Sequence, residues 1–236
     1  MTAGDLAPRL HVIGAFQLLV GGRPVSLATN ARRLLAYLAV AGGAQRRDRV
    51  AGQLWGWVPQ AQARAMLRTA LWRVRQIPAD VVRTDREELR LGAGLRVDLA
   101  ESTALARELL DTGAVPASPD AFTDDILPGW EEDWLHLERE RHRQLRIHAL
   151  EALSERLTAT GRYAAAIDVA YRAIAAEPLR ESAYGALIRA HIAEGNRVEA
   201  AHQLDVYRHL LADELGLDPS ERLTSLVLEG SVVPVG

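Results

Sequence analysis

Residues 61–77 read AQARAMLRTALWRVRQI, and residues 81–91 read VVRTDREELRL. At 100° per residue, the apolar side chains of the first stretch fall on one side of a helix. They are Ala63, Leu67, Ala70, Leu71, Val74 and Ile77. In the second stretch, two apolar runs flank the polar residues Asp85-Arg86-Glu87-Glu88, which predicts a short hairpin. The two stretches therefore predict a helix with one buried face, followed by a β-hairpin.

The opposite side of the predicted helix presents residues that can recognise nucleic acid. Arginine pairs with guanine, glutamine with adenine and apolar surface with the thymine methyl group, and arginine also binds phosphates. A solvated helix face would tolerate arginine and glutamine equally well, but an exposed indole at Trp72 calls for a partner. That partner is either a DNA groove or the second part of the chain. We expect base contacts from Arg68, Thr69, Trp72, Arg73 and Gln76, and phosphate contacts from the flanking Arg64 and Arg75.

The elements before this helix complete a known arrangement. Residues 10–20 are rich in apolar and β-branched types, and Gly21-Gly22 separate them from residues 23–27, which predicts a hairpin. Residues 30–41 have helical periodicity and end at two glycines, and residues 48–54 form a shorter helix. Strands, three helices and a closing hairpin predict a winged helix-turn-helix, an α+β domain whose last helix enters the major groove.

The sign of the charge changes near residue 97. Residues 1–97 contain fifteen arginines and six acidic residues, whereas residues 98–236 contain thirteen arginines and twenty-five acidic residues. We therefore expect a basic domain over 1–97 with a surface for a polyanion, and a second domain over 98–236. The alternative is that two solvated surfaces simply differ in charge.

Further basic residues lie near the predicted recognition helix. Arg32, Arg46 and Arg47 are placed to reach phosphates. Arg83 and Arg86 of the hairpin are candidates as well, although its tip is acidic at Asp85, Glu87 and Glu88, where a wing that follows phosphates should be neutral or basic.

Four segments of the first domain resemble the winged helix of OmpR-type regulators and, more closely, that of the SARP family, the antibiotic regulatory protein activators of actinomycetes. They are the first hairpin, Arg32-Arg33-Leu34-Leu35, Leu54-Trp55-Gly56 and Leu71-Trp72-Arg73-Val74-Arg75. The resemblance implies that residues 61–77 are the recognition helix. The Gly-Tyr pair common in the wings of that family is absent here.

The second domain is predicted to be all-α. A helix over about 99–110 precedes a loop at 111–123 and a long charged helix that ends near Thr160. Gly161 and Gly195 are 34 residues apart, as are Ala166 and Ala200, which is the period of tetratricopeptide repeats. Two units are fewer than the ~3 that a stable stack needs, so we expect flanking helices to complete it.

This domain also resembles a family, the bacterial transcriptional activator domain that follows the winged helix in SARP proteins. The resemblance rests on Leu127-Pro128-Gly129-Trp130, Trp134, Glu138-Arg139-Glu140-Arg141, Glu177-Pro178-Leu179-Arg180-Glu181 and the segment 211–220. It implies a transcription activator that binds direct repeats in double-stranded promoter DNA as a homodimer. It further implies recruitment of RNA polymerase holoenzyme to secondary-metabolite (antibiotic) gene clusters.

Several functional classes lack their signatures. The chain has no cysteine for a disulfide or a thiolate metal site, and no lysine for a phosphate-binding P-loop. The seven histidines have no metal-ligand spacing, and the pairs His202/His209 and His136/His142 are expected on solvated or partly packed helix faces. We therefore expect no enzyme activity, cofactor or metal site.

The sequence also predicts a cytoplasmic, nucleoid-associated protein. No apolar run approaches ~18 residues, and no basic segment with an apolar stretch opens the chain.

The sequence leaves an alternative function open. In this alternative, the chain is a helical-repeat adaptor whose basic residues 61–77 bind an acidic protein instead of DNA. If residues 1–97 are a domain, a fragment ending at Arg96 should still bind DNA, though less tightly because avidity from the dimer is lost.

Overall fold

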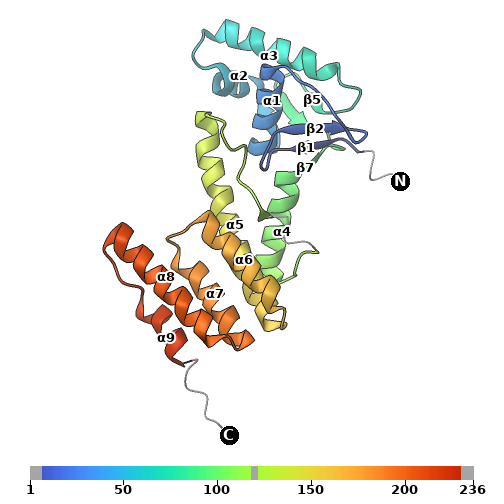
Figure 1. The fold of residues 1–236 in the computed structure, drawn as a ribbon. Coiled ribbons are helices and arrows are strands. Elements are labelled where there is room, and N and C mark those ends of the chain that lie inside the picture. Colours follow the sequence, from blue (N-terminus) through green and yellow to red (C-terminus); the bar gives the residue numbers. More distant parts are fainter. Residues whose placement is uncertain (1–6, 118–121, 230–236) are drawn as a thin grey trace. The chain divides into compact units, whose positions relative to one another are not determined.

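The computed structural model describes residues 7–117 and 122–229, which divide into two compact units (Figure 1). The first unit combines Met1–Ala104 with Asp124–His142, and the second combines Leu105–Thr123 with Arg143–Gly236. The division passes through two helices, α4 (Asp98–Thr112) and α5 (Asp133–Ala159).

The first unit opens with a four-stranded sheet in the order β3-β2-β1-β7. Its strands are β1 (Arg9–His11), β2 (Gln17–Val20), β3 (Arg23–Pro24) and β7 (Arg96–Val97). The expected turn at Gly21-Gly22 is confirmed, because both glycines have positive φ and β2 pairs antiparallel with β3. The run 10–20, however, is two strands instead of one, since the chain turns at Gly14, whose φ of 72° favours glycine.

Three helices follow in the predicted order: α1 (Thr29–Ala41), α2 (Arg47–Trp55) and α3 (Gln60–Arg75). Helix α1 ends at Gly42, whose N–H donates to the carbonyl of Leu38 at 3.1 Å. The buried residues of α3 are Ala63, Leu67, Ala70, Leu71 and Val74, and Ile77 is buried just beyond its end. These are the six positions that the helical periodicity predicted to be buried.

A three-stranded sheet in the order β4-β6-β5 completes the winged helix-turn-helix. Strands β5 (Val82–Thr84) and β6 (Glu88–Leu91) form the expected hairpin, and Leu89 is fully buried in the core that α1 also lines. Strand β4 (Gln45–Arg46) pairs with β6 and was not predicted, because two residues carry no periodic signal. The α+β winged-helix fold is confirmed.

The compact units differ from the domain boundary expected at residue 97. Ile126, Leu127 and Leu135 are buried in the same core as α1 and α3. The Leu127 N–H donates to the carbonyl of Val12 at 2.8 Å, and the segment 124–142 therefore belongs to the first unit. The sign of the charge changes at one point in the sequence, near residue 97. The two compact units are instead defined by which apolar side chains pack together, and each combines separate stretches of the chain.

This assignment changes the charge balance that the sequence suggested. The first unit contains seventeen arginines and fifteen acidic residues, a net charge of +2. The second contains eleven arginines and sixteen acidic residues, a net charge of −5. The strong contrast between basic and acidic halves is therefore a property of the linear chain, and any polyanion surface must be sought locally.

The second unit is helical, as expected. After the end of α5 come α6 (Tyr163–Ala176), α7 (Glu181–Glu194), α8 (Arg197–Leu215) and α9 (Glu221–Glu229). Helix α7 packs against α6, α8 and α9.

The 34-residue repeat corresponds to helix pairs. Gly161 and Gly195 both have positive φ directly before a first helix, and Ala166 and Ala200 are fully buried. Leu150, Leu153 and Leu157 of α5 pack with Ala166, so a flanking helix extends the stack as predicted. The loop expected at 111–123 lies partly outside the described residues, because residues 118–121 are not among them.

Candidate nucleic-acid interface

The outward face of α3 presents the side chains that the sequence assigned to it. Arg68, Thr69, Trp72, Arg73 and Gln76 are exposed, and the indole of Trp72 is 55% accessible. On the same helix every buried residue is apolar. The face therefore combines two cations, a hydroxyl, an amide and one aromatic ring on a rigid element anchored by its opposite side.

Neighbouring groups hold several of these side chains in place. The guanidinium carbon of Arg73 lies 5.1 Å from the ring centroid of Trp72, a cation–π contact. The Gln76 Nε2 donates to the carbonyl of Trp72 at 3.3 Å, and the Thr69 hydroxyl donates to the carbonyl of Ala65 at 3.2 Å. These contacts are local, and each leaves further donors or acceptors of the side chain available to a ligand.

Two flanking arginines connect α3 to other elements. The Nη2 of Arg75 donates to the Thr84 hydroxyl of β5 at 2.7 Å. Arg64 donates from Nε and Nη2 to the two carboxylate oxygens of Asp48 in α2, at 2.8 and 3.0 Å. This hydrogen bond from Arg64 is the main reason that the pKa of Asp48 is lowered, and the same bond raises the pKa of Arg64.

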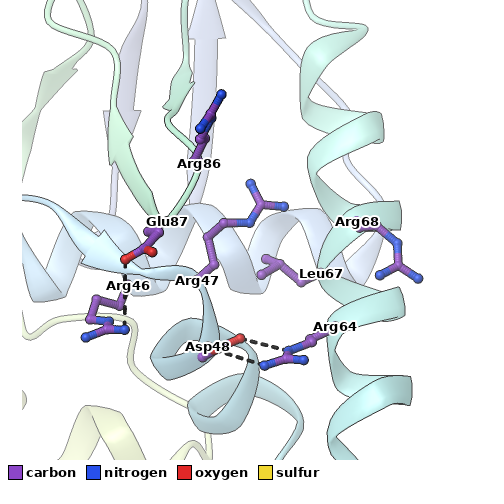
Figure 2. Close-up of a pocket in the computed structure, with 8 residues that line it drawn as sticks. All are labelled: Arg46, Arg47, Asp48, Arg64, Leu67, Arg68, Arg86 and Glu87. Atoms are coloured by element: carbon purple, nitrogen blue, oxygen red, sulfur yellow. Dashed lines mark hydrogen bonds and ion pairs between the residues drawn. The ribbon is translucent and has the colours of Figure 1, made fainter.

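A hollow of about 260 Å³ lies among α2, α3, β4 and the tip of the β5–β6 hairpin (Figure 2). We call it the arginine hollow. Five arginines and two acidic residues line it, so its local charge is positive. Figure 2 shows Arg47 extending between the hairpin tip and α3, whereas Arg68 points away from that space. The lining residues are Arg46, Arg47, Asp48, Arg64, Leu67, Arg68, Arg86 and Glu87.

The acidic tip of the wing is partly neutralised within the fold. Glu87 lies 4.0 Å from the Nη2 of Arg46, and its carbonyl accepts the N–H of Arg47 at 2.8 Å. Asp85 accepts the N–H of Arg86 within the turn at 2.6 Å. The tip thus places two residues beside the arginine hollow, Arg86 and Glu87, and the charge of Glu87 is offset by Arg46.

Not every candidate arginine joins this surface. Arg83 donates to Asp80 at 2.7 Å and lines a separate hollow with Asp85, Glu88 and Arg90. Arg32 lies over the rings of Phe16 and Trp130, 5.3 and 5.6 Å from their centroids. The structure therefore brings Arg46, Arg47, Arg64, Arg68 and Arg86 together and leaves Arg32 and Arg83 apart from them.

Sequence reasoning missed the part that Asp48 plays in this surface. It is the single acid within the run Arg46-Arg47-Asp48-Arg49, and an acid inside the densest arginine cluster could have indicated an internal ion pair. Its partner is sixteen residues away on another helix, so the pairing itself depends on how α2 packs against α3.

Residues 7–117 and 122–229 contain neither a metal-binding cluster nor a membrane-spanning helix. That part of the chain contains no group of three or more histidine, aspartate or glutamate side chains able to hold a metal ion. None of its helices is both long and apolar enough to cross a bilayer.

Comparison with known proteins adds a family and a fold. Residues 87–229 match the family described as "Bacterial transcriptional activator domain". The regulatory protein AfsR of Streptomyces coelicolor is 29% identical over 237 residues, and AfsR of Streptomyces griseus is 29% identical over 243 residues. Each alignment covers 93% of this chain but 24% of the relative, so the chain spans about a quarter of the length of these relatives.

Among solved structures, the fold is similar to that of Mycobacterium tuberculosis EmbR, determined in complex with a low-affinity phosphopeptide. The TM-score is 0.76 at 21% sequence identity. The match covers 98% of this chain and 66% of the EmbR chain.

Proposed function

Because the chain belongs to the family that carries the bacterial transcriptional activator domain, the family of SARP-type regulators, we propose that it is a sequence-specific DNA-binding activator of transcription. That family consists of transcription regulators and is not a class of enzymes. The observation that carries the proposal is the outward face of α3, where exposed arginine, glutamine and tryptophan side chains stand on a helix whose other face is wholly buried.

In this function α3 lies in the major groove. Arg68, Arg73 and Gln76 hydrogen-bond to base edges, and the exposed ring of Trp72 packs against a thymine methyl group. The arginine hollow follows the phosphate backbone beside the groove, and its net positive charge supplies the part of the affinity that does not depend on sequence.

The finer parts of the proposal come from the family resemblance. The protein binds direct repeats at promoters as a homodimer, recruits RNA polymerase holoenzyme and controls a secondary-metabolite gene cluster in the cytoplasm, on the nucleoid. Direct repeats require two copies in the same orientation along the duplex, so the contact between the copies joins two different surfaces of the chain.

Selection of binding sites from a random duplex pool at ~150 mM salt, followed by sequencing, tests the proposal. The expected result is an enriched motif that recurs at a spacing of about 11 base pairs or a multiple of it, since adjacent copies then lie on one face of the duplex. Addition of purified RNA polymerase holoenzyme to the selected duplex should give a ternary complex.

Failure to enrich any motif, from protein that circular dichroism shows to be folded, would contradict the proposal. In that case the arginine surface would be assigned to an acidic protein partner and the chain to the class of helical-repeat adaptors. Salt dependence alone does not separate the two functions, because both kinds of binding are electrostatic.

A further inference from the structure

Some arginines of the arginine hollow already lie beside a carboxylate of the protein, and others do not. Arg64 is engaged by both oxygens of Asp48, and Arg46 lies near Glu87. In the described part of the chain, the side chains of Arg47 and Arg86 form no ion pair. The hollow therefore carries a positive charge that attracts an anion, yet the donor fork of Arg64 is already occupied by a carboxylate of the protein itself.

The geometry of that pair is the geometry of phosphate recognition. Two N–H groups of one guanidinium point at two oxygens of one anion, at 2.8 and 3.0 Å, and arginine binds phosphate oxygens with the same fork. The side chains of Arg64 and Asp48 are 47% and 54% exposed, so a duplex that approaches α3 can reach both.

Asp48 also keeps its charge under the conditions in which DNA binds. The bond from Arg64 holds the pKa of Asp48 below its ordinary range, with smaller contributions from Arg46 and Arg47. At neutral pH the carboxylate is therefore ionised, and it competes with any other anion for the same two donors.

We infer that Asp48 is an internal competitor of DNA phosphate for Arg64, and that it lowers the affinity of the protein for duplex DNA of any sequence. This inference rests on the proposed function, because it assumes a duplex against α3. On binding, the Arg64 fork leaves the carboxylate for a phosphate, and Asp48 remains as an uncompensated negative charge beside the DNA backbone. Both effects weaken the complex, and neither depends on the bases.

Replacement of Asp48 by asparagine (Asp48→Asn) tests the inference directly. The dissociation constant is measured for the full chain on a duplex of scrambled sequence and on a selected site, over a range of salt concentrations. Release of Arg64 should increase the steepness of log K against log salt by about one, and should tighten binding roughly five-fold at ~150 mM salt. The factor should be the same on both duplexes, since phosphates carry no sequence information.

Two controls separate this mechanism from a change in net charge. Glu101→Gln removes the same charge and releases Arg96, whose Nε lies 2.5 Å from Glu101 in a pair of similar exposure outside the hollow. It should tighten binding by less than about two-fold, because distant surface charges are screened at this ionic strength. In an Arg64→Gln background, Asp48→Asn should lose most of its effect.

The outcomes are distinct. The inference is overturned if Asp48→Asn binds as the unaltered protein does, if Glu101→Gln has an equal effect, or if the effect persists without Arg64. Absence of any duplex binding by folded unaltered protein would instead contradict the proposed function. Asp48→Ser is measured in parallel, with circular dichroism on every variant, so that a disturbance of α2 by asparagine does not decide the result.

Discussion

Trp72 is a large aromatic side chain on the outward face of α3 whose exposure calls for a partner. Its indole is 55% exposed at the middle of the outward face of α3, with the Arg73 guanidinium against its ring. Large aromatic surfaces left in water forgo the free energy that burial provides, about 25 cal/mol per Å². Together, Trp72 and Arg73 place an aromatic ring and a cation side by side on the exposed face of α3.

Arg73→Ala should weaken binding to the selected site by about 1–3 kcal/mol and relax the preference at one base position, because a bidentate contact to guanine is lost. Competition binding against duplexes changed at single positions measures both effects. Arg23→Ala, an exposed arginine at the β2–β3 turn, is the matched control and should leave affinity and preference unchanged. Affinity equal to that of the unaltered protein would remove Arg73 from the interface.

Arg33 helps to hold the segment 124–142 against the helices of the first unit. Its Nε and Nη2 donate to the two carboxylate oxygens of Glu132, at 2.5 and 2.8 Å, and Nη2 also donates to the carbonyl of Leu54 at 2.8 Å. The two side chains are only 13% and 16% exposed. Removal of one member of such a largely buried pair costs more than removal of one member of a surface pair, because the other charge is left without its counter-charge away from water.

Arg33→Ala should therefore lower the free energy of unfolding of the first unit by about 3 kcal/mol. Urea unfolding followed by tryptophan fluorescence measures the change. Arg96→Ala breaks the exposed pair with Glu101 and should lower the stability by less than about 1 kcal/mol. Equal losses of unfolding free energy in the two variants would show that the Arg33–Glu132 pair contributes no more to stability than a surface pair does.

At the scale of elements, the helices of the second unit are joined by a tyrosine cluster. The rings of Tyr184 in α7 and Tyr207 in α8 are 4.4 Å apart, and the Tyr207 hydroxyl donates to the carbonyl of Leu179 at 3.2 Å. Burial raises the pKa of Tyr184, Tyr207 and the nearby Tyr171 above the ordinary value of 10.0. The packing of α7 against α8 thus depends on neutral phenols.

Because these tyrosines hold their protons more tightly when folded, their contribution is complete below the ordinary pKa of 10.0 and is lost as the pH rises through the folded values. The second unit should therefore lose stability as the pH rises above about 10. Thermal melts followed by circular dichroism across this range measure the loss. Tyr207→Phe should reduce the alkaline loss, and an unchanged pH profile in this variant would contradict the assignment to Tyr207.

At the scale of the whole molecule, the first unit is closed by residues that lie beyond the winged helix in the sequence. The carboxylate of Asp98 accepts the N–H of Val12 at 2.9 and 3.1 Å and that of Ile13 at 3.1 Å. Leu99, Ile126, Leu127 and Leu135 fill the core beneath α1. A winged helix cut after its wing would lack these groups, so we expect the fragment ending at Arg96 to lack part of the core that supports the DNA-binding surface.

A fragment of residues 1–142 should fold and bind a single half-site, whereas residues 1–96 should not fold stably. Deletion of a buried leucine-sized side chain lowers stability by about 2–5 kcal/mol, so loss of four approaches or exceeds the ~5–15 kcal/mol of a whole domain. Thermal unfolding and half-site binding of the two fragments measure the difference. A cooperative transition in residues 1–96 would show that the segment 124–142 only covers a complete core.

The sequence by itself determined the elements whose signals are local. The two faces of α3, the β5–β6 hairpin, the end of α1 and the 34-residue spacing of the helix pairs follow from periodicity and turn residues within one or two elements. Such patterns arise because 3.6-residue and two-residue periods place neighbouring side chains on fixed faces, whatever the rest of the chain does. The exposed residues of α3 could therefore be named before the fold was known, and their contact with bases stays a prediction.

Only the tertiary structure decided which distant segments share a core and which charges meet. The bond between Val12 and Asp98 joins residues 86 apart, that between Arg33 and Glu132 joins residues 99 apart, and Asp48 meets Arg64 across two helices. Arg32 and Arg83 were grouped with the DNA-facing arginines by type, yet their neighbours are an aromatic pair and Asp80. Composition cannot distinguish these cases, because the partner of a charge is set by how helices and strands pack and not by its position along the chain.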